Sequence, residues 1–262
     1  MNSRVVRFIS ITILGMLFVA IVGLPLVTDA STTRRVRVPI LMYHHVSDLP
    51  SDADRTRKTL TIAPDSFLAE MQYLKDNGYT VISLYELYDS LTNNAALPPN
   101  PIVLTFDDGY EDAYQIVFPI LQQFGFTATF FIITKPVDGG DSAYMSWDQI
   151  HQMSDADMSM EAHTQTHPDL RHRNADFLVN EIGGSLDDIA AHTGQQPHMF
   201  AYPSGMYDAN TLKVLRTLPV WLAVTTRRGS SESSRHPLEL PRVRISPHTS
   251  IAGFAGLLKQ YS

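Results

Sequence analysis

The 262-residue chain has no cysteine, so it can form no disulfide, no thiolate metal site and no cysteine-linked lipid anchor. It also lacks a basic stripe, and its formal net charge of -7 argues against nucleic-acid binding. Neither a Gly-x-Ser-x-Gly elbow, nor a phosphate-binding loop, nor a dinucleotide-binding fingerprint is present. These absences remove the commonest serine-hydrolase route and two nucleotide-binding classes.

Long apolar runs are confined to the N-terminus. Arg4 and Arg7 precede an apolar run over residues 8–27, about 20 residues, which is close to the length that spans a bilayer. Small residues at 28–30 could form a cleavage site, but the apolar core is longer than that of a usual signal peptide. We expect residues 1–30 to be an uncleaved signal-anchor, with a cleaved signal peptide as the alternative. Either way the body is expected to be extracytoplasmic, anchored to the membrane or else periplasmic or secreted.

The body of the chain, residues 38–262, alternates short apolar runs typical of strands with amphipathic stretches typical of helices. The run 102–106 is apolar apart from Thr105, as expected of a strand covered on both faces. Seven or eight such units predict one α/β domain, a distorted or incomplete (β/α) barrel of about seven parallel strands. In barrels of this kind the functional residues lie where strands end and loops begin.

Two adjacent carboxylates, Asp107 and Asp108, follow this apolar run and precede Gly109. Buried carboxylates are costly unless they are paired, so the pair needs an explanation. One explanation is structural: one aspartate caps the next helix and the other forms a salt bridge. The other is chemical. Adjacent residues at a strand end point in different directions, so one can bind a metal while its neighbour stays free as a base.

A histidine pair, His163 and His167, supplies further candidate metal ligands. Two histidines four residues apart can converge on one ion, either on a helical turn or at a corner between a strand and a loop. Pro168 disfavours a helix through His167, which favours the corner. One aspartate and two histidines would leave positions open for water and substrate, the arrangement expected of a catalytic zinc.

Three motifs then occur in a recognisable order: Thr105-Phe106-Asp107-Asp108-Gly109, His163-Thr164-Gln165-Thr166-His167 and Tyr202-Pro203-Ser204-Gly205. Together they resemble the polysaccharide deacetylase family, carbohydrate esterase family 4, and the likeness covers residues 38–246. Two finer features, the segment Pro39-Ile40-Leu41-Met42-Tyr43-His44-His45 and the run Phe200-Ala201-Tyr202-Pro203, resemble one branch of it. That branch deacetylates poly-β-1,6-N-acetylglucosamine in biofilm matrices.

The resemblance implies that Asp107 is the general base and that Asp108, His163 and His167 hold a divalent ion. Zinc is the expected ion, with cobalt, nickel or iron as alternatives. Such an ion polarises the acetyl carbonyl and acidifies its bound water. A backbone N–H at Ser204 would stabilise the oxyanion, with Tyr202 in the same substrate-binding motif.

The chain departs from the commonest family pattern at two places. Ala201 stands where many members have an arginine that orients the base, so something else must position Asp107. No late Leu-x-His motif is found near residues 241–244, so the resemblance to the biofilm branch points to His44 as the general acid, with His45 or His248 as alternatives. Trp221 is a candidate sugar-stacking platform, and core packing is its alternative interpretation.

The sequence therefore predicts an extracytoplasmic, metal-dependent hydrolase that removes N-acetyl groups from N-acetylglucosamine units, with poly-β-1,6-N-acetylglucosamine as the first candidate polymer. Peptidoglycan or a chitin-like chain is the alternative substrate. A non-catalytic carbohydrate-binding module on the same fold is the alternative from a different class, and the missing arginine is its only support. The expected partners are a polysaccharide and, if the N-terminal segment stays uncleaved, a membrane.

Overall fold

The computed structural model describes residues 33–262, so the predicted signal-anchor over residues 1–30 lies outside the described residues. Among the residues that are described, none of the helices has the length and apolar character needed to cross a membrane. The predicted body of the protein, residues 38–262, falls entirely within this range.

Seven parallel strands close into a barrel. Their order around it is β2 (Ile40–Tyr43), β12 (Leu240–Arg244), β10 (Leu222–Arg228), β9 (Met199–Ala201), β8 (Ser159–Ala162), β7 (Thr129–Ile132) and β6 (Pro101–Asp108). The barrel closes because β2 pairs with both β12 and β6. A short strand, β5 (Thr80–Val81), pairs with the start of β6. The predicted barrel of about seven parallel strands is confirmed, and its ring is complete.

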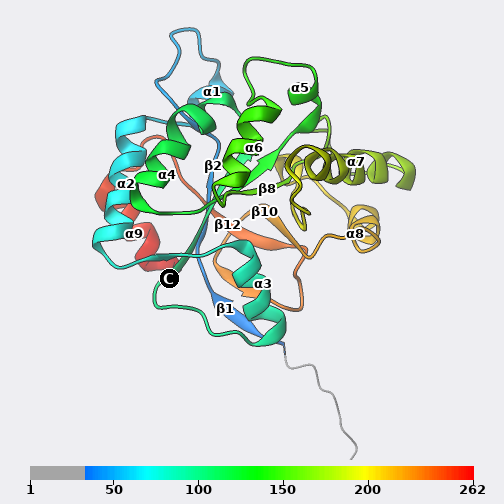
Figure 1. Ribbon diagram of the computed structural model, residues 1–262. Helices are drawn as coiled ribbons and strands as arrows, with labels where there is room; N and C mark the ends of the chain where they lie inside the picture. The colour runs from blue at the N-terminus through cyan, green and yellow to red at the C-terminus, as the bar shows by residue number, and fades with distance from the viewer. Residues whose placement is uncertain (1–32) are drawn as a thin grey trace, which may run out of the picture. The chain divides into compact units, whose positions relative to one another are not determined.

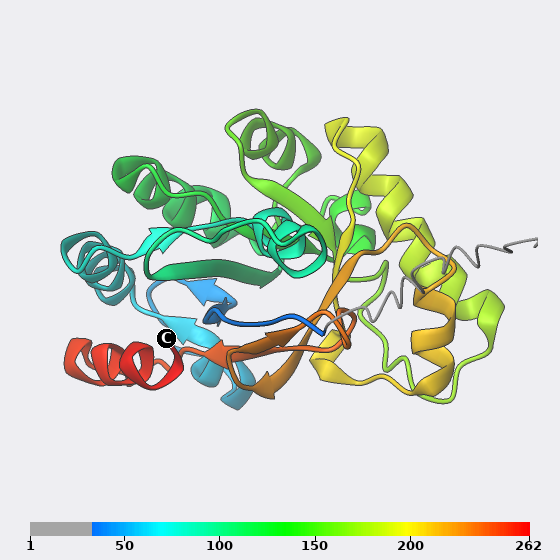
Figure 2. The same ribbon diagram turned by 90° about the horizontal axis from the view of Figure 1, so that it is seen from below.

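Helices surround the barrel, as Figures 1 and 2 show. The longer ones are α2 (Pro64–Asp76), α6 (Trp147–Asp155), α7 (Ala175–Thr193) and α9 (Ile251–Tyr261), and shorter ones are α1 (Arg55–Leu60), α4 (Phe118–Phe124), α5 (Thr134–Asp138) and α8 (Ala209–Leu215). A π-helical turn, η1 (Ala113–Val117), precedes α4, and a 3₁₀ turn, η2 (Pro203–Gly205), follows β9. Helix α3 (Leu84–Asn93) lies below the strands in Figure 1. Its leucines pack against the hydrophobic side chains inside the barrel, so the helix closes the N-terminal end of the barrel.

Two small ladders lie outside the ring. The strand β1 (Arg35–Arg37) pairs antiparallel with β11 (Ser231–Ser233), and β3 (His45–Val46) pairs parallel with β4 (Thr61–Ile62). The first joins the start of the described chain to the segment between β10 and β12. The second lies just beyond the end of β2, because β3 begins two residues after β2 ends.

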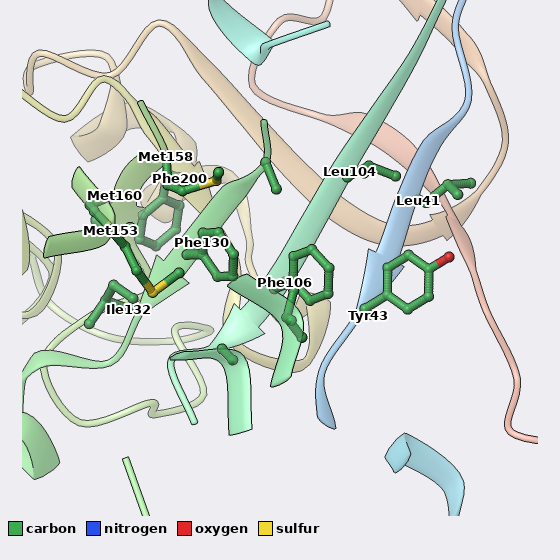
Figure 3. Packing of buried hydrophobic residues seen from close by; sticks show 14 of the residues in the cluster. Leu41, Tyr43, Leu104, Phe106, Phe130, Ile132, Met153, Met158, Met160 and Phe200 are labelled. Atoms are coloured by element: carbon green, nitrogen blue, oxygen red, sulfur yellow. The ribbon is translucent and has the colours of Figure 1, made fainter. Parts of the chain in front are cut away.

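Alternation along each strand sorts side chains between the barrel interior and the helices. On β6, Leu104 and Phe106 belong to the hydrophobic cluster between the strands and the surrounding helices. Val103 belongs to the second hydrophobic cluster, which fills the interior of the barrel. Figure 3 shows Phe106 between Tyr43 and Phe130, and its ring centroid lies 5.2 Å and 5.0 Å from theirs. Burying each such aromatic ring contributes about 1.5–3 kcal/mol. By the same alternation Asp107, two residues beyond Thr105 and four beyond Val103, faces the interior.

Residues 33–262 form one compact unit that contains the seven-stranded ring and both core clusters. A closed sheet and a hydrophobic core of its own are what an independently folding domain requires.

Candidate active site

The two adjacent aspartates end strand β6, and the strand alternation separates them. Asp107 is buried inside the barrel, while Asp108 adopts a left-handed backbone with φ of 80° and turns toward the loops. Gly109 follows with φ of 79°, and a Cβ there would approach Ile132 Cδ1 to 3.2 Å. Glycine is therefore required at the point where the chain leaves the strand.

The two histidines converge on Asp108. The Asp108 Oδ1 atom lies 3.3 Å from His163 Nε2 and 3.6 Å from His167 Nε2. Strand β8 ends at Ala162, and the His167 amide donates to Thr164 Oγ1 at 2.9 Å in the loop that follows. The predicted corner between strand and loop is confirmed. One ligand atom from each of the three side chains lies within 4.8 Å of the others, as a shared metal ion requires.

Hydrogen bonds orient the His163 ring and anchor the loop that carries His167. His163 Nδ1 lies 2.7 Å from the carbonyl oxygen of Ala201, so Nδ1 carries the proton and Nε2 keeps its lone pair for a metal. The loop between the histidines is anchored to α7, where the Glu181 carboxylate accepts from the Thr166 amide at 2.9 Å and from its hydroxyl at 2.7 Å. One carboxylate and two imidazoles, one of them oriented through its second nitrogen, therefore fit a divalent ion of the zinc type, with coordination positions left for other ligands.

Arg242, which was not among the predicted site residues, forms an ion pair with Asp107. Arg242, on β12, is 1% exposed, and its Nη1 and Nη2 donate to Asp107 Oδ1 and Oδ2 at 2.7 Å and 2.6 Å. Its Nε donates to the Thr225 carbonyl at 3.0 Å, and Nη1 also reaches Thr105 Oγ1 at 3.1 Å. This bidentate pair supplies the positioning that the family's usual arginine, replaced here by Ala201, would give.

The ion pair also sets the charge of Asp107. Burial alone would raise the pKa of this carboxyl, but the charge and hydrogen bonds of Arg242 outweigh burial and hold the pKa below its ordinary value of 3.8. Asp107 is therefore ionised at neutral pH, as a general base must be before it accepts a proton.

Of the three candidate acids, His44 lies at the site. Its Nε2 is 3.9 Å from Asp107 Oδ2, and the side chain is 12% exposed, so it remains accessible from the barrel mouth. Burial, the largest influence, lowers the pKa of His44 to about 4, although Asp107 and Asp108 act in the opposite direction. The ring is therefore neutral at pH 7 and has to gain a proton before it can donate one.

His45 is committed to another network. Arg57 Nη1 donates to its Nε2 at 2.7 Å, which leaves the proton on Nδ1, and Nδ1 donates to Asp112 Oδ2 at 2.8 Å. The ring also stacks on Tyr110 with centroids 3.5 Å apart. With both nitrogens engaged, His45 has no proton free for a substrate. His248 is exposed in the loop between β12 and α9.

The third motif forms a tight turn at the end of β9. Ser204 has φ of 53° and Gly205 has φ of 70°, and a Cβ on Gly205 would come within 2.1 Å of Thr226 Oγ1. Ser204 is exposed, and within residues 33–262 its backbone N–H meets no acceptor. The geometry thus leaves this amide free to donate to an oxyanion. Asp108, Thr164, His167 and Ser204 are all left-handed, so backbone strain gathers in the site's loops.

The structure places two of the predicted substrate-binding side chains away from the metal-ligand set. Tyr202 is 1% exposed and its hydroxyl donates to the Leu238 carbonyl at 2.7 Å, so the side chain supports the turn and cannot touch a polymer. Trp221 precedes β10 and its amide donates to the His198 carbonyl, which precedes β9. It therefore lies at the N-terminal end of the barrel, opposite the site, where its ring stacks on His198 with centroids 3.8 Å apart. At 38% exposed and outside both core clusters, Trp221 does not fit the alternative interpretation, core packing, either.

Comparison with known proteins agrees with this geometry. Residues 94–222 match the family model described as polysaccharide deacetylase. The putative polysaccharide deacetylase of Bacillus subtilis is 31% identical over 230 residues, which cover 87% of this chain and 78% of that protein. A Streptococcus pyogenes deacetylase, solved in complex with acetate, has 33% sequence identity and a TM-score of 0.79, covering 86% of this chain and 99% of that chain.

Two relatives carry names that specify a substrate. A poly-β-1,6-N-acetyl-D-glucosamine N-deacetylase of Escherichia coli is 23% identical over 82% of this chain, which corresponds to 37% of that protein. A peptidoglycan-N-acetylmuramic acid deacetylase of Bacillus subtilis is 31% identical over 55% of this chain and 52% of that protein. With its closed barrel, its three motifs and these matches along most of its described length, the chain belongs to the polysaccharide deacetylase family.

Proposed function

We propose that the protein is a metal-dependent N-deacetylase that acts on N-acetylglucosamine units of an extracytoplasmic polysaccharide, with poly-β-1,6-N-acetylglucosamine as its polymer. One observation carries the proposal. Asp107, bound through both carboxylate oxygens by Arg242, is adjacent in the chain to Asp108, which forms the candidate metal site with His163 and His167. A base next to a candidate metal site is an arrangement suited to metal-assisted hydrolysis of an unactivated amide.

The chemistry divides among these residues. Asp108, His163 and His167 would hold a divalent ion, which supplies polarisation of the acetyl carbonyl and acidification of a water molecule. Asp107 takes a proton from the water as its oxygen bonds to the acetyl carbon, and the Ser204 N–H donates to the developing oxyanion. Arg242 keeps Asp107 in place and ionised until that step.

The C–N bond then breaks, and the leaving nitrogen needs a proton to depart as an amine. His44 is suited to deliver it, because its Nε2 lies 3.9 Å from the Asp107 oxygen that has just gained one. A small movement of either side chain would allow the proton to pass. The products are acetate and a glucosamine unit with a free amine.

The likeness to the Escherichia coli enzyme and the early Tyr43-His44-His45 segment support the β-1,6-linked polymer. The likeness to the peptidoglycan deacetylase supports peptidoglycan as a second candidate. The non-catalytic alternative rested on the arginine missing at position 201, and Arg242 removes that argument by binding Asp107 from another strand. We further propose that the apolar run over residues 8–27 anchors the enzyme outside the cytoplasm.

A single assay tests the proposal. Residues 31–262, purified, are expected to bind about one zinc-like ion and to release acetate from N-acetylglucosamine oligomers, and a chelator should abolish the release. Comparing β-1,6 oligomers, β-1,4 oligomers and peptidoglycan identifies the polymer. Retained metal with no acetate from any acetylated polymer would instead mean a carbohydrate-binding module.

Replacing His44 with alanine should lower kcat by roughly a hundredfold, the usual effect of removing a general acid. Metal content should hardly change, because His44 is not among the three candidate ligands. Acetate release measured beside bound zinc separates the two effects. His248→Ala is the matched control, since that histidine is exposed. An activity loss in the His248 variant, with none in the His44 variant, would reverse the assignment.

A further inference from the structure

A cavity of about 670 Å³ lies outside the barrel, and four arginines line it. Arg35 and Arg37 come from β1, and Arg227 and Arg228 from the end of β10. None of the candidate catalytic or metal-binding residues lines the cavity. In Figure 1, β1 lies at the bottom of the molecule, whereas α5, which follows β7, lies at the top. The cavity is therefore separate from the deacetylase site.

The ladder between β1 and β11 fixes one wall of the cavity. Arg35 pairs with Ser233 and Arg37 with Ser231, so alternation places both guanidiniums and both serines on the same face of the ladder. The intervening Glu232 is buried on the other face. Positive groups and hydroxyl donors thus line the cavity together, while the nearest carboxylate of β11 faces away from it.

No acidic side chain among residues 33–262 forms an ion pair with any of these four arginines. Three of them contact backbone oxygens or an aromatic ring. Arg227 donates to the Glu239 carbonyl, Arg228 lies over the Tyr261 ring at 5.6 Å, and Arg37 Nη1 lies 3.5 Å from the backbone oxygen of Ser262. The one carboxylate lining the cavity, that of Glu239, accepts from the Tyr207 hydroxyl at 2.9 Å.

Four guanidiniums around one hollow, none of them in an ion pair with a described side chain, repel one another. A neutral acetylated glycan would relieve little of this repulsion. A multiply charged anion would relieve it directly, and the planar guanidinium fork matches the oxygens of phosphate with paired hydrogen bonds. The volume of the cavity also admits more than a single small ion.

We propose that this cavity, defined by Arg35, Arg37, Arg227 and Arg228, is a binding site for phosphate groups, separate from the deacetylase site. The phosphate comes either from a free oligophosphate anion or from a lipid headgroup, and both present the same chemistry to the arginines. Binding weakens as salt screens the charges.

The test uses residues 33–262, which contain the complete barrel and core. Sodium tripolyphosphate is titrated by calorimetry, and vesicles of phosphatidylglycerol are compared with vesicles of phosphatidylcholine by co-sedimentation. Two double variants remove opposite walls of the cavity: Arg227→Gln with Arg228→Gln, and Arg35→Gln with Arg37→Gln. The matched control, Arg55→Gln with Lys75→Gln, makes the same charge change at exposed positions outside the cavity.

Each cavity variant is expected to weaken tripolyphosphate or phosphatidylglycerol binding by about tenfold, and the control by far less. Acetate release and thermal melting should stay close to wild type in all of them. Loss of tripolyphosphate binding alone identifies the free anion as the source, and loss of phosphatidylglycerol binding identifies the headgroup. Absence of binding by the wild type, or an equal loss in the control, would overturn the proposal.

Discussion

Asp107→Asn is expected to lower kcat for acetate release by roughly a thousandfold while leaving metal content nearly unchanged. The amide keeps the shape of the carboxylate but cannot take a proton from water. The candidate ligands Asp108, His163 and His167 remain in place, so a metal would still be bound. Acetate release and bound zinc are measured on the same preparation, which separates loss of turnover from loss of metal.

A buried carboxylate at the other end of the barrel provides the control for this variant. Glu161 is 1% exposed on β8, and its carboxylate accepts from the Tyr85 hydroxyl at 2.8 Å and from the Met199 amide at 2.7 Å. Burial raises its pKa to about 7, so Glu161→Gln replaces a group that already carries a proton part of the time at neutral pH. This variant should retain acetate release. Comparable activity in Asp107→Asn would rule out Asp107 as the base.

Arg242→Met is expected to reduce the free energy of unfolding by about 3–5 kcal/mol, because it leaves the buried Asp107 carboxylate without its counter-charge. Activity should fall as well, since the base loses both its orientation and the group that keeps it ionised. Denaturant unfolding followed by circular dichroism measures the stability, and acetate release measures the activity.

The combination Asp107→Asn with Arg242→Met tests the cause of that loss. With the charge of the aspartate removed too, part of the stability should return, giving a coupling energy between the two sites. Losses that simply add would show that Arg242 stabilises the barrel through other contacts, such as those to Thr225 and Thr105.

Acid provides a second check on the same pair. The ion pair depresses the pKa of Asp107, so its contribution to wild-type stability is present above the ordinary value of 3.8 and is lost as pH falls below it. Arg242 is the largest of the influences that lower this pKa, so without it the pKa rises and the carboxylate takes up a proton at a higher pH. The stability deficit of Arg242→Met should therefore shrink as the pH is lowered.

The sequence sufficed for the parts of the site that are local. Asp107 and Asp108 are adjacent, and His163 and His167 are four residues apart, so strand alternation and a corner after a strand bring them to one end of the barrel. The strand at residues 102–106 and the barrel class also followed from the apolar pattern, because these depend on short-range periodicity.

Arg242 could not be found in this way. It lies 135 residues from Asp107, and its partner is known only once the order of strands around the ring is known. One signal was present: Arg242 follows Leu240 by two residues, so strand alternation places its charged side chain on the same inner face as Leu240. The positions of the Trp221 and Tyr202 rings could not be predicted for a related reason. Residue type alone does not reveal which end of a strand, or which side of a turn, a ring occupies.

The closing of the ring has a consequence for how the protein folds. Strand β12 must dock beside β2, about 200 positions earlier in the chain, before Arg242 can reach Asp107. Such long-range pairing is slow to form, because a large loop has to close before any contact compensates for the lost entropy. Until that strand arrives, the barrel holds an uncompensated negative charge, which disfavours partly assembled chains. Catalytic competence and completion of the fold therefore arrive in the same step.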